Sequence, residues 1–275
     1  MKKLIIVADW GADSLTCQEV RSAIEGFLPR SVYTPNIRFV ASTPSTLQTS
    51  FIIAQLVEVE EKLGRPKQTV IFQNTDPRLQ TRKGVKKAEG ADMIVVKLSS
   101  GLFVCGPNAG YDFSLIKEKI EEIYICNNKK AGSQFRSRDL YSEISAKLMT
   151  DKLEKLDLTL TNTKIIPKAT DTAILHIDNY GNIKTNIKLK DFLKKYSYGD
   201  NIKVSINDKT CEVLFVDNLF GAIPGVLIIY PGSSGKKQDP YLEISVRREF
   251  TEEDPTTGLH AFANPRPGQK IIIEK

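Results

Sequence analysis

The chain has 275 residues, which is long enough for two hydrophobic cores. Its hydrophobic content of 41% and charged content of 26% are ordinary for a soluble globular protein. No apolar run approaches the length that a bilayer requires, so no membrane span is expected. The apolar stretch after Lys3 is short and meets Asp9, which indicates a buried first strand rather than a signal peptide, and we expect a cytoplasmic protein.

The formal net charge is +6, and the lysines are spread along the chain rather than gathered into one block. The sequence has no continuous basic stripe with interleaved aromatic residues, so nucleic-acid binding is not expected. The four cysteines are scattered without a Cys-x-x-Cys pair, and His176 and His260 lie far apart. We therefore expect neither a disulfide framework nor a metal site.

The first part of the chain alternates short apolar runs with amphipathic stretches. Strand–helix alternation of this kind predicts an α/β domain with a mainly parallel sheet and helices on both faces. The predicted strands are Leu4–Val7, Ile37–Ala41, Val70–Gln73, Met93–Lys97 and Ile123–Cys126. The predicted helices are Thr16–Phe27, Leu47–Leu63, Phe113–Ile123 and Arg138–Leu158.

The character of the chain changes after about Ile165, where short strands are separated by turn residues. Regular short strands predict a small antiparallel barrel or sandwich. We place the boundary between Asp157 and Lys168, which gives an N-terminal α/β domain over 1–160 and a C-terminal β-barrel domain over 168–275. The predicted strands are Ala173–Ile177, Asn201–Ile206, Thr210–Phe215, Val226–Tyr230, Tyr241–Val246 and Lys270–Ile273.

Four polar segments are candidates for ligand binding. One is the stretch 178–186, which follows an apolar run and concentrates side-chain oxygens and amides, as a ligand with both an amine and a carboxylate requires. Taken alone, the same residues are also those of a type I′ hairpin turn. The other three follow predicted strands of the first domain, where open α/β sheets place ligands, and are the segments 9–13, 73–83 and 132–139.

Each of these three loops has a simpler structural interpretation. Asp13 or Ser14 is expected to cap the helix that follows, which leaves Asp9 as the candidate for holding a ribose diol. The segment 73–83 is also consistent with a surface turn that carries an exposed ion pair. The glycine-led segment 132–139 has two arginines and opens a helix, which favours an anion pocket, although a capped helix start accounts for it too.

Taken together and in order, these segments resemble the S-adenosylmethionine hydroxide adenosyltransferase family, which includes relatives of the fluorinase and chlorinase enzymes. The resemblance extends over nearly the whole chain. Its motifs are Ala8-Asp9-Trp10-Gly11, Asn74-Thr75-Asp76-Pro77, Gly106-Pro107-Asn108-Ala109-Gly110, Phe135-Arg136-Ser137-Arg138-Asp139, Asp178-Asn179-Tyr180-Gly181-Asn182, Ser233-Ser234-Gly235 and Leu242-Glu243-Ile244-Ser245-Val246.

The resemblance implies a homotrimer with ligand sites at subunit interfaces and no cofactor besides the substrate. Asp9 would hold the ribose hydroxyls, and the amino-acid group of the substrate would be held by Asp178, Asn182 and Ser233. The adenosine would meet Phe135, Phe220 and the backbone after Val246. The implied reaction is attack of water or hydroxide on the ribose C5′ of S-adenosylmethionine, which gives adenosine and methionine.

The water-activating trio of this family is Asp, Arg and His, and the sequence departs from it. Asp76 matches the first position, and Arg82 or Lys83 matches the second because the loop is one residue short. Arg136 stands at the histidine position, and an arginine stays protonated and cannot act as a base. Ser137 matches the serine that the fluorinase presents to its halide, but the fluorinase's long extra loop is absent and Ser234 replaces its arginine.

Three functions are therefore open. The first is an adenosine-forming S-adenosylmethionine hydrolase, in which positioning and a dry pocket supply most of the catalysis because the leaving thioether is neutral. The second is a non-catalytic nucleoside-binding or S-adenosylmethionine-binding protein that has lost the histidine. A halide-using variant is the third.

Overall fold

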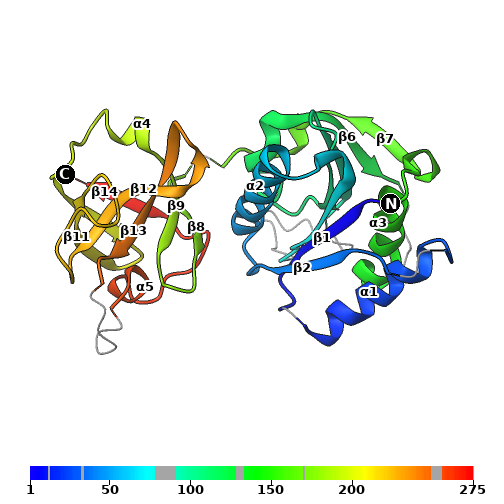
Figure 1. The fold of residues 1–275 in the computed structure, drawn as a ribbon, viewed down its shortest axis with the longest axis horizontal. Helices are drawn as coiled ribbons and strands as arrows, with labels where there is room; N and C mark the ends of the chain where they lie inside the picture. Colours follow the sequence, from blue (N-terminus) through cyan, green and yellow to red (C-terminus); the bar gives the residue numbers. More distant parts are fainter. Residues whose placement is uncertain are drawn as a thin grey trace, which may run out of the picture. The chain divides into compact units, whose positions relative to one another are not determined.

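The computed structural model describes residues 1–11, 13–31, 34–77, 91–127, 133–169, 171–248 and 256–274. The chain forms two compact units, Met1–Ala169 and Thr170–Lys275 (Figure 1). No helix among the described residues is long and apolar enough to cross a membrane.

The first unit is built on a seven-stranded sheet with the order β2-β1-β3-β5-β4-β6-β7 (Figure 1). Strands β2, β1, β3 and β5 are parallel, whereas β5, β4, β6 and β7 pair antiparallel. The sheet is therefore mixed, with a parallel half and an antiparallel half. Its strands are β1 (Lys3–Ala8), β2 (Ile37–Ala41), β3 (Thr69–Asn74), β4 (Met93–Leu98), β5 (Phe103–Pro107), β6 (Ile120–Cys126) and β7 (Leu158–Thr161).

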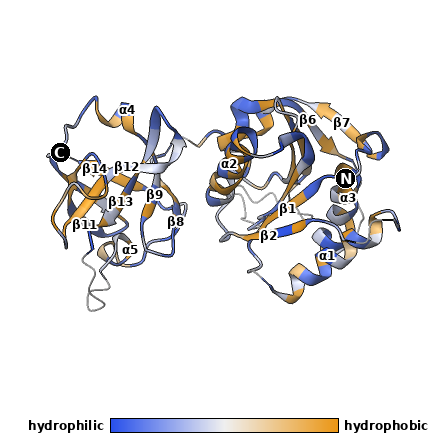
Figure 2. Ribbon diagram, in the orientation of Figure 1, coloured by the Kyte–Doolittle hydropathy of each residue, from blue (hydrophilic) through white to orange (hydrophobic). Residues whose placement is uncertain are grey.

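Helices cover both faces of this sheet, as predicted. Helices α1 (Leu15–Phe27) and α3 (Ser142–Met149) pack together against Leu4, Ile6 and Phe72, and α2 (Thr46–Lys62) lies across the sheet from them (Figure 1). Both α1 and α2 show mixed hydrophilic and hydrophobic residues in Figure 2, as expected for helices with one face on a core. A π-helical turn, Ser137–Tyr141, leads into α3.

Two helix predictions differ from the structure. The segment predicted as a helix over 113–123 is a 3₁₀ turn, Ser114–Lys119, followed by strand β6, which pairs with β4. The segment predicted as a helix over 138–158 ends at Met149, and β7 begins at Leu158. The remaining short 3₁₀ turns of this unit are Pro66–Gln68, Leu153–Lys155 and Thr163–Ile165.

The second unit is a curled seven-stranded sheet with the order β14-β10-β11-β12-β13-β9-β8. All neighbouring strands are antiparallel except β11 and β12. A bridge between Ala173 and Lys270 links the two edges, so the sheet curls round on itself. The strands are β8 (Ile174–Ile177), β9 (Ile183–Lys188), β10 (Asn201–Ile206), β11 (Lys209–Phe215), β12 (Leu227–Lys236), β13 (Asp239–Val246) and β14 (Ile271–Glu274).

The interior of this barrel is apolar. Ile183, Ile202 and Phe215 are fully buried within one cluster that contains side chains from every strand of the sheet. Two short helices, α4 (Leu189–Phe192) and α5 (Gly258–Ala261), lie between strands. The predicted fold class, an α/β domain plus a C-terminal β-barrel, is confirmed, but the first sheet is mixed rather than mainly parallel.

Candidate functional site

Asp9 and Asp76 lie at the carboxyl ends of neighbouring parallel strands in the first unit. Strands β1 and β3 pair in register up to Ala8 and Asn74; Asp9 is the next residue after Ala8, and Asp76 lies two residues after Asn74. This edge of an open α/β sheet is where ligands usually bind. The buried hydroxyl of Thr75 lies 2.7 Å from that of Thr49, which anchors the start of the loop after β3.

Asp76 is held by Arg136. The Arg136 Nη2 atom lies 3.0 Å from Asp76 Oδ2, and only 23% and 13% of the two side chains are exposed. Ala91 joins the pair through its backbone, because its N–H donates to Asp76 Oδ2 at 3.2 Å and its carbonyl accepts from Arg136 Nη1 at 3.2 Å. Asp76 and Arg136, which were predicted to lie close together, thus form a partly buried ion pair.

Burial raises the pKa values of several acidic groups at this edge of the sheet. Burial, with a smaller contribution from the negative charge of Asp76, raises the pKa of Asp9 above its usual range. Burial raises the pKa of Tyr141 to about 12, and the guanidinium of Arg136 lies over its ring at 5.6 Å from the centroid. The Tyr141 hydroxyl is buried without a hydrogen-bond partner among the described residues.

Asp112 is a further acid at this edge that the motifs did not indicate. It is fully buried, and its pKa is raised to about 8, mainly by burial and in smaller part by the charge of Asp76. Asp112 Oδ2 accepts the N–H of Ala109 at 3.2 Å, whereas Oδ1 has no partner among the described residues. Asp112 is therefore a carboxylic acid at neutral pH, because its pKa lies above 7.

The aromatic candidate Phe135 contacts the loop that follows β1. Its ring meets Trp10 edge-on with centroids 6.2 Å apart, and Arg138 lies over it at 5.1 Å. Ser137 is buried at the start of the π-helical turn. Phe135 and Ser137 flank Arg136 in sequence, and Trp10 of the loop after β1 contacts Phe135.

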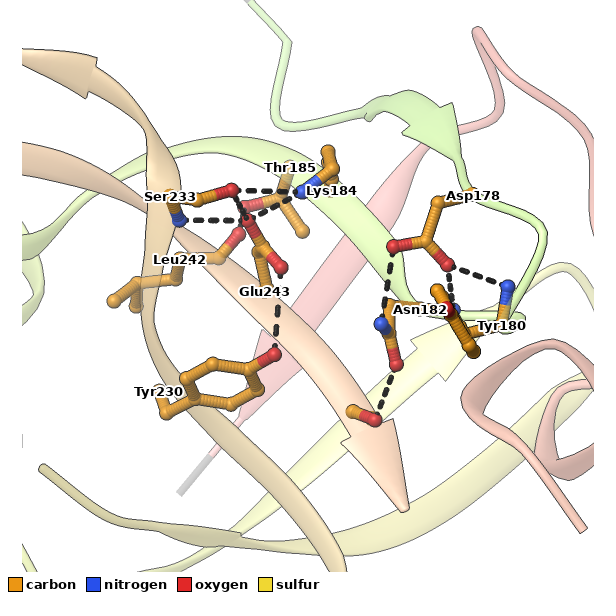
Figure 3. Close-up of polar contacts among 10 residues, drawn as sticks. Asp178, Tyr180, Asn182, Lys184, Thr185, Tyr230, Ser233, Leu242 and Glu243 are labelled. Atoms are coloured by element: carbon orange, nitrogen blue, oxygen red, sulfur yellow. Dashed lines mark hydrogen bonds and ion pairs between the residues drawn. The ribbon is translucent and has the colours of Figure 1, made fainter. Parts of the chain in front are cut away.

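In the second unit, Asp178 and Asn182 form one hydrogen-bonded turn between β8 and β9 (Figure 3). Asp178 Oδ1 accepts the N–H groups of Tyr180 and Asn182 at 2.9 and 3.0 Å. Asp178 Oδ2 accepts from Asn182 Nδ2 at 3.0 Å, and Asn182 Oδ1 accepts the hydroxyl of Ser245. This stretch therefore contains both features that the sequence predicted: a hairpin turn and a concentration of polar groups.

Ser233 belongs to a second polar cluster centred on the buried Glu243 (Figure 3). Glu243 Oε1 accepts the N–H of Ser233 at 2.9 Å and the ammonium of Lys184 at 2.6 Å, and Tyr230 donates to Oε2 at 3.3 Å. Lys184 also donates to Ser233 Oγ at 3.2 Å. A bulge in β12 between Pro231 and Gly235 lays Ser233 against Glu243.

The two remaining candidates lie at the end of β13 and in the loop after β11. Phe220 is 72% exposed, and the guanidinium of Arg247 covers its ring at 5.0 Å. Val246 is buried, and the backbone after it is paired within the unit, because Arg247 donates to the carbonyl of Val226 at 3.0 Å and accepts from Gly225 at 2.6 Å.

The predicted residues therefore form two groups in the first unit and three in the second, while Arg82 and Lys83 lie outside the described residues. Sequence reasoning missed Asp112, Lys184 and Glu243. The signal for Glu243 was a single acid between Leu242 and Ile244, which resembles the solvent side of a strand. Across the described ranges, no group of three or more His, Cys, Asp or Glu is placed to hold a metal ion.

Comparisons with known proteins identify the family of the C-terminal domain. Residues 172–255 match the S-adenosylmethionine hydroxide adenosyltransferase C-terminal domain family. The chain is also similar to the (R)-S-adenosyl-L-methionine hydrolase of Methanocaldococcus jannaschii, with 30% identity over 134 residues. That match spans 42% of this chain and only 44% of the hydrolase.

Solved structures share the fold over the whole chain. A conserved protein from Thermotoga maritima superposes with a TM-score of 0.64 over 98% of this chain and 99% of its own, at 19% identity. A conserved protein from Thermus thermophilus gives a TM-score of 0.64 over 100% of both chains, at 13% identity. Residues 172–255 therefore belong to the S-adenosylmethionine hydroxide adenosyltransferase C-terminal domain family, and the motifs before them resemble those of the same family.

Proposed function

We propose that the protein hydrolyses S-adenosylmethionine to adenosine and L-methionine by substitution at the ribose C5′. The observation that carries this proposal is the placement of Asp9, Asp76 and Arg136 at the carboxyl edge of parallel strands, in a chain whose second unit carries the family's C-terminal domain. The family of the C-terminal domain gives the substrate class, and the name of the Methanocaldococcus relative gives the reaction type.

The residues divide according to the two ends of the substrate. Asp9 accepts hydrogen bonds from the ribose hydroxyls, and Phe135 contacts the adenosine. Asp178 and Asn182, with Ser233, hold the amino-acid end. In this proposal the protein acts as a homotrimer, as the family resemblance implies, and Phe220 and the backbone after Val246 contact the adenine.

The reaction makes one bond and breaks one bond. An oxygen lone pair of water attacks C5′, the C5′–S electron pair moves to sulfur, and the thioether of methionine leaves as a neutral group. The water proton passes to Asp76 or to solvent, so no general acid is needed for the leaving group. Alignment of the water with the C5′–S bond and exclusion of other water molecules provide most of the rate enhancement.

Arg136 replaces a base with a fixed cation in this scheme. Its guanidinium carries five N–H donors, and the described contacts to Asp76 and Ala91 use one on each of two nitrogens. Further donors can orient the water oxygen or stabilise a hydroxide. Arg136 cannot accept the water proton, so we expect slower turnover than in a relative that carries histidine at this position.

The test is incubation of the purified chain with S-adenosylmethionine, with adenosine and methionine followed by chromatography. Equal amounts of both products, formed in proportion to protein concentration and lost in Asp76→Asn, are expected. A parallel incubation with chloride or fluoride tests the halide-using variant, which would give a 5′-halogenated adenosine instead.

The Asp76–Arg136 ion pair favours a second candidate, a binding protein without turnover. The carboxylate of Asp76 already accepts a guanidinium and a backbone N–H through Oδ2, so that oxygen is occupied before a water molecule arrives. Binding of S-adenosylmethionine by calorimetry, with no adenosine after long incubation at high protein concentration, would identify this function and contradict the hydrolase.

A further inference from the structure

We infer that Lys184 binds the α-carboxylate of the amino-acid end of the ligand, and is therefore the residue that makes this end of the pocket specific for an amino acid rather than an amine. This inference rests on the proposed function. It starts from three cross-strand pairs on adjacent strands of the barrel: His176 pairs with Lys184, Lys184 with Glu243, and Glu243 with Tyr230.

The ammonium of Lys184 touches the group already expected to contact the amino-acid end. Its Nζ atom lies 3.2 Å from Ser233 Oγ and 2.6 Å from Glu243 Oε1. These contacts use two of the three N–H donors of the ammonium. The side chain is 14% exposed, so the third donor can reach a ligand at the surface of the barrel.

A buried hydroxyl next in sequence to Ser233 also lacks a partner. Ser234 follows Ser233 in the same bulge, and its hydroxyl is buried without a hydrogen bond among the described residues. Buried hydroxyls are nearly always paired, so an unpaired one in the bulge that carries Ser233 is a donor that a polar group of the ligand can use. A carboxylate has two acceptor oxygens and can satisfy both Lys184 and Ser234.

Charge balance supports the same assignment. The Asp178 turn and the Glu243 cluster contribute two carboxylates and two cations, Lys184 and Arg248, and burial together with the charge of Lys184 lowers the pKa of His176. Glu243 is already paired with Lys184, so Asp178 remains for the ligand's ammonium. Without Lys184, the ligand's carboxylate would face the negative charges of Asp178 and Glu243. Lys184 is thus the cation that allows an amino acid to enter.

The experiment compares two ligands that differ only in this carboxylate. Binding of S-adenosylmethionine and of its decarboxylated analogue, S-adenosyl-3-methylthiopropylamine, is measured by calorimetry on the full chain. A charge-assisted hydrogen bond makes the wild type prefer S-adenosylmethionine by about ten- to a hundredfold. Lys184→Met should reduce that preference to about twofold, mainly through weaker binding of S-adenosylmethionine.

Three variants keep the test interpretable. Removing Lys184 alone leaves Glu243 buried and unpaired, so Lys184→Met/Glu243→Gln removes both charges, and it should lose the preference while keeping a cooperative thermal transition. Lys188→Met, on the exposed side of the same strand, should keep the preference. Arg248→Met tests the other cation near the turn, whose Nη2 donates to the carbonyl of Tyr180 at 2.9 Å.

The outcomes separate this inference from the proposed function. Equal binding of both ligands by the wild type, or loss of the preference in Arg248→Met but not in Lys184→Met, would overturn the role of Lys184 and leave the hydrolase untouched. Failure of the wild type to bind either ligand would instead contradict the proposed function.

Discussion

The proposed activation of water depends on the Asp76–Arg136 pair. A protonated arginine, 3.0 Å from the carboxylate, orients charge but removes the proton acceptor that a histidine would provide. Arg136→His restores an acceptor whose usual pKa lies near neutrality. We expect the rate of adenosine formation from S-adenosylmethionine to rise by about ten- to a hundredfold, within the range of a general base.

Arg65→His is the matched control for this variant, because Arg65 is an exposed arginine of the same unit. It should leave the rate unchanged. If Arg136→His binds S-adenosylmethionine as the wild type does but forms no more adenosine, then Arg136 is not at the position where water is activated.

Asp112 makes the stability of the protein depend on pH. Its pKa is about 8 in the folded chain against an ordinary value of 3.8, so the folded state keeps a proton that the unfolded state releases. The contribution of Asp112 to the free energy of unfolding therefore falls as pH rises from about 4 to about 8, and this contribution does not change outside that window. At pH 8, Asp112→Asn should stabilise the protein by about 1–3 kcal/mol, as expected for removing a buried, poorly paired acid.

Urea denaturation at pH 4.5 and pH 8 measures this effect. The gain from Asp112→Asn should be much larger at pH 8, whereas Asp208→Asn, at an exposed aspartate, should show none at either pH. Equal effects of Asp112→Asn at both pH values would show that Asp112 is not held in its protonated form.

At the scale of elements, the turn between β8 and β9 is the part of the barrel that we propose to hold the amino-acid end of the ligand. Gly181 lies in this turn at φ 75°, and a Cβ atom there would overlap the hydroxyl of Thr257. Gly181→Ala should destabilise the protein by about 2–3 kcal/mol and weaken ligand binding, because backbone strain and a steric clash add together.

Gly199 separates the two causes. It has φ 96°, but a Cβ atom there would meet nothing within 4 Å. Gly199→Ala should therefore cost only the backbone term, about 1 kcal/mol. Thermal unfolding of both variants checks this difference, and equal destabilisation would mean that Thr257 moves aside without cost.

The sequence predicted elements best where the pattern was local. Strands β2 and β10 have the predicted bounds, because apolar residues recur at every second position in both of them. Strand β5 was not predicted, since Gly106 and Pro107 in its five residues resemble a loop. Residues 120–123 were predicted as helix, but pairing of β6 with β4 and β7 overrides the helical spacing of their apolar side chains.

In the candidate site, too, the residues that a local sequence pattern marks were the ones that could be predicted. Asp9, Asp76 and Asp178 stand beside recognisable strand ends, so their motifs could be found from sequence. The contacts of Lys184 and Glu243 depend on strand register and on the bulge in β12, and neither is encoded within a short window. The partner of Asp76 depends on a contact across 60 residues, which sequence spacing alone does not reveal.

At the scale of the whole molecule, the second unit exposes apolar side chains that an assembly could cover. Phe220 and Ile223 are 72% and 74% exposed within one loop. We expect sedimentation equilibrium to give three times the mass of the 30.8 kDa chain, and Phe220→Ser with Ile223→Ser to shift the protein toward monomer. A single wild-type species with the mass of one chain would contradict the homotrimer.

Hydrolysis of S-adenosylmethionine at C5′ can be tested by running the reaction in ¹⁸O-labelled water. Mass spectrometry should find one ¹⁸O atom in the 5′-hydroxyl of adenosine and unlabelled methionine in equal amount, because the nucleophile is water and the C5′–S bond is the one that breaks. Adenosine without the label, or no adenosine from protein that binds S-adenosylmethionine, would contradict it.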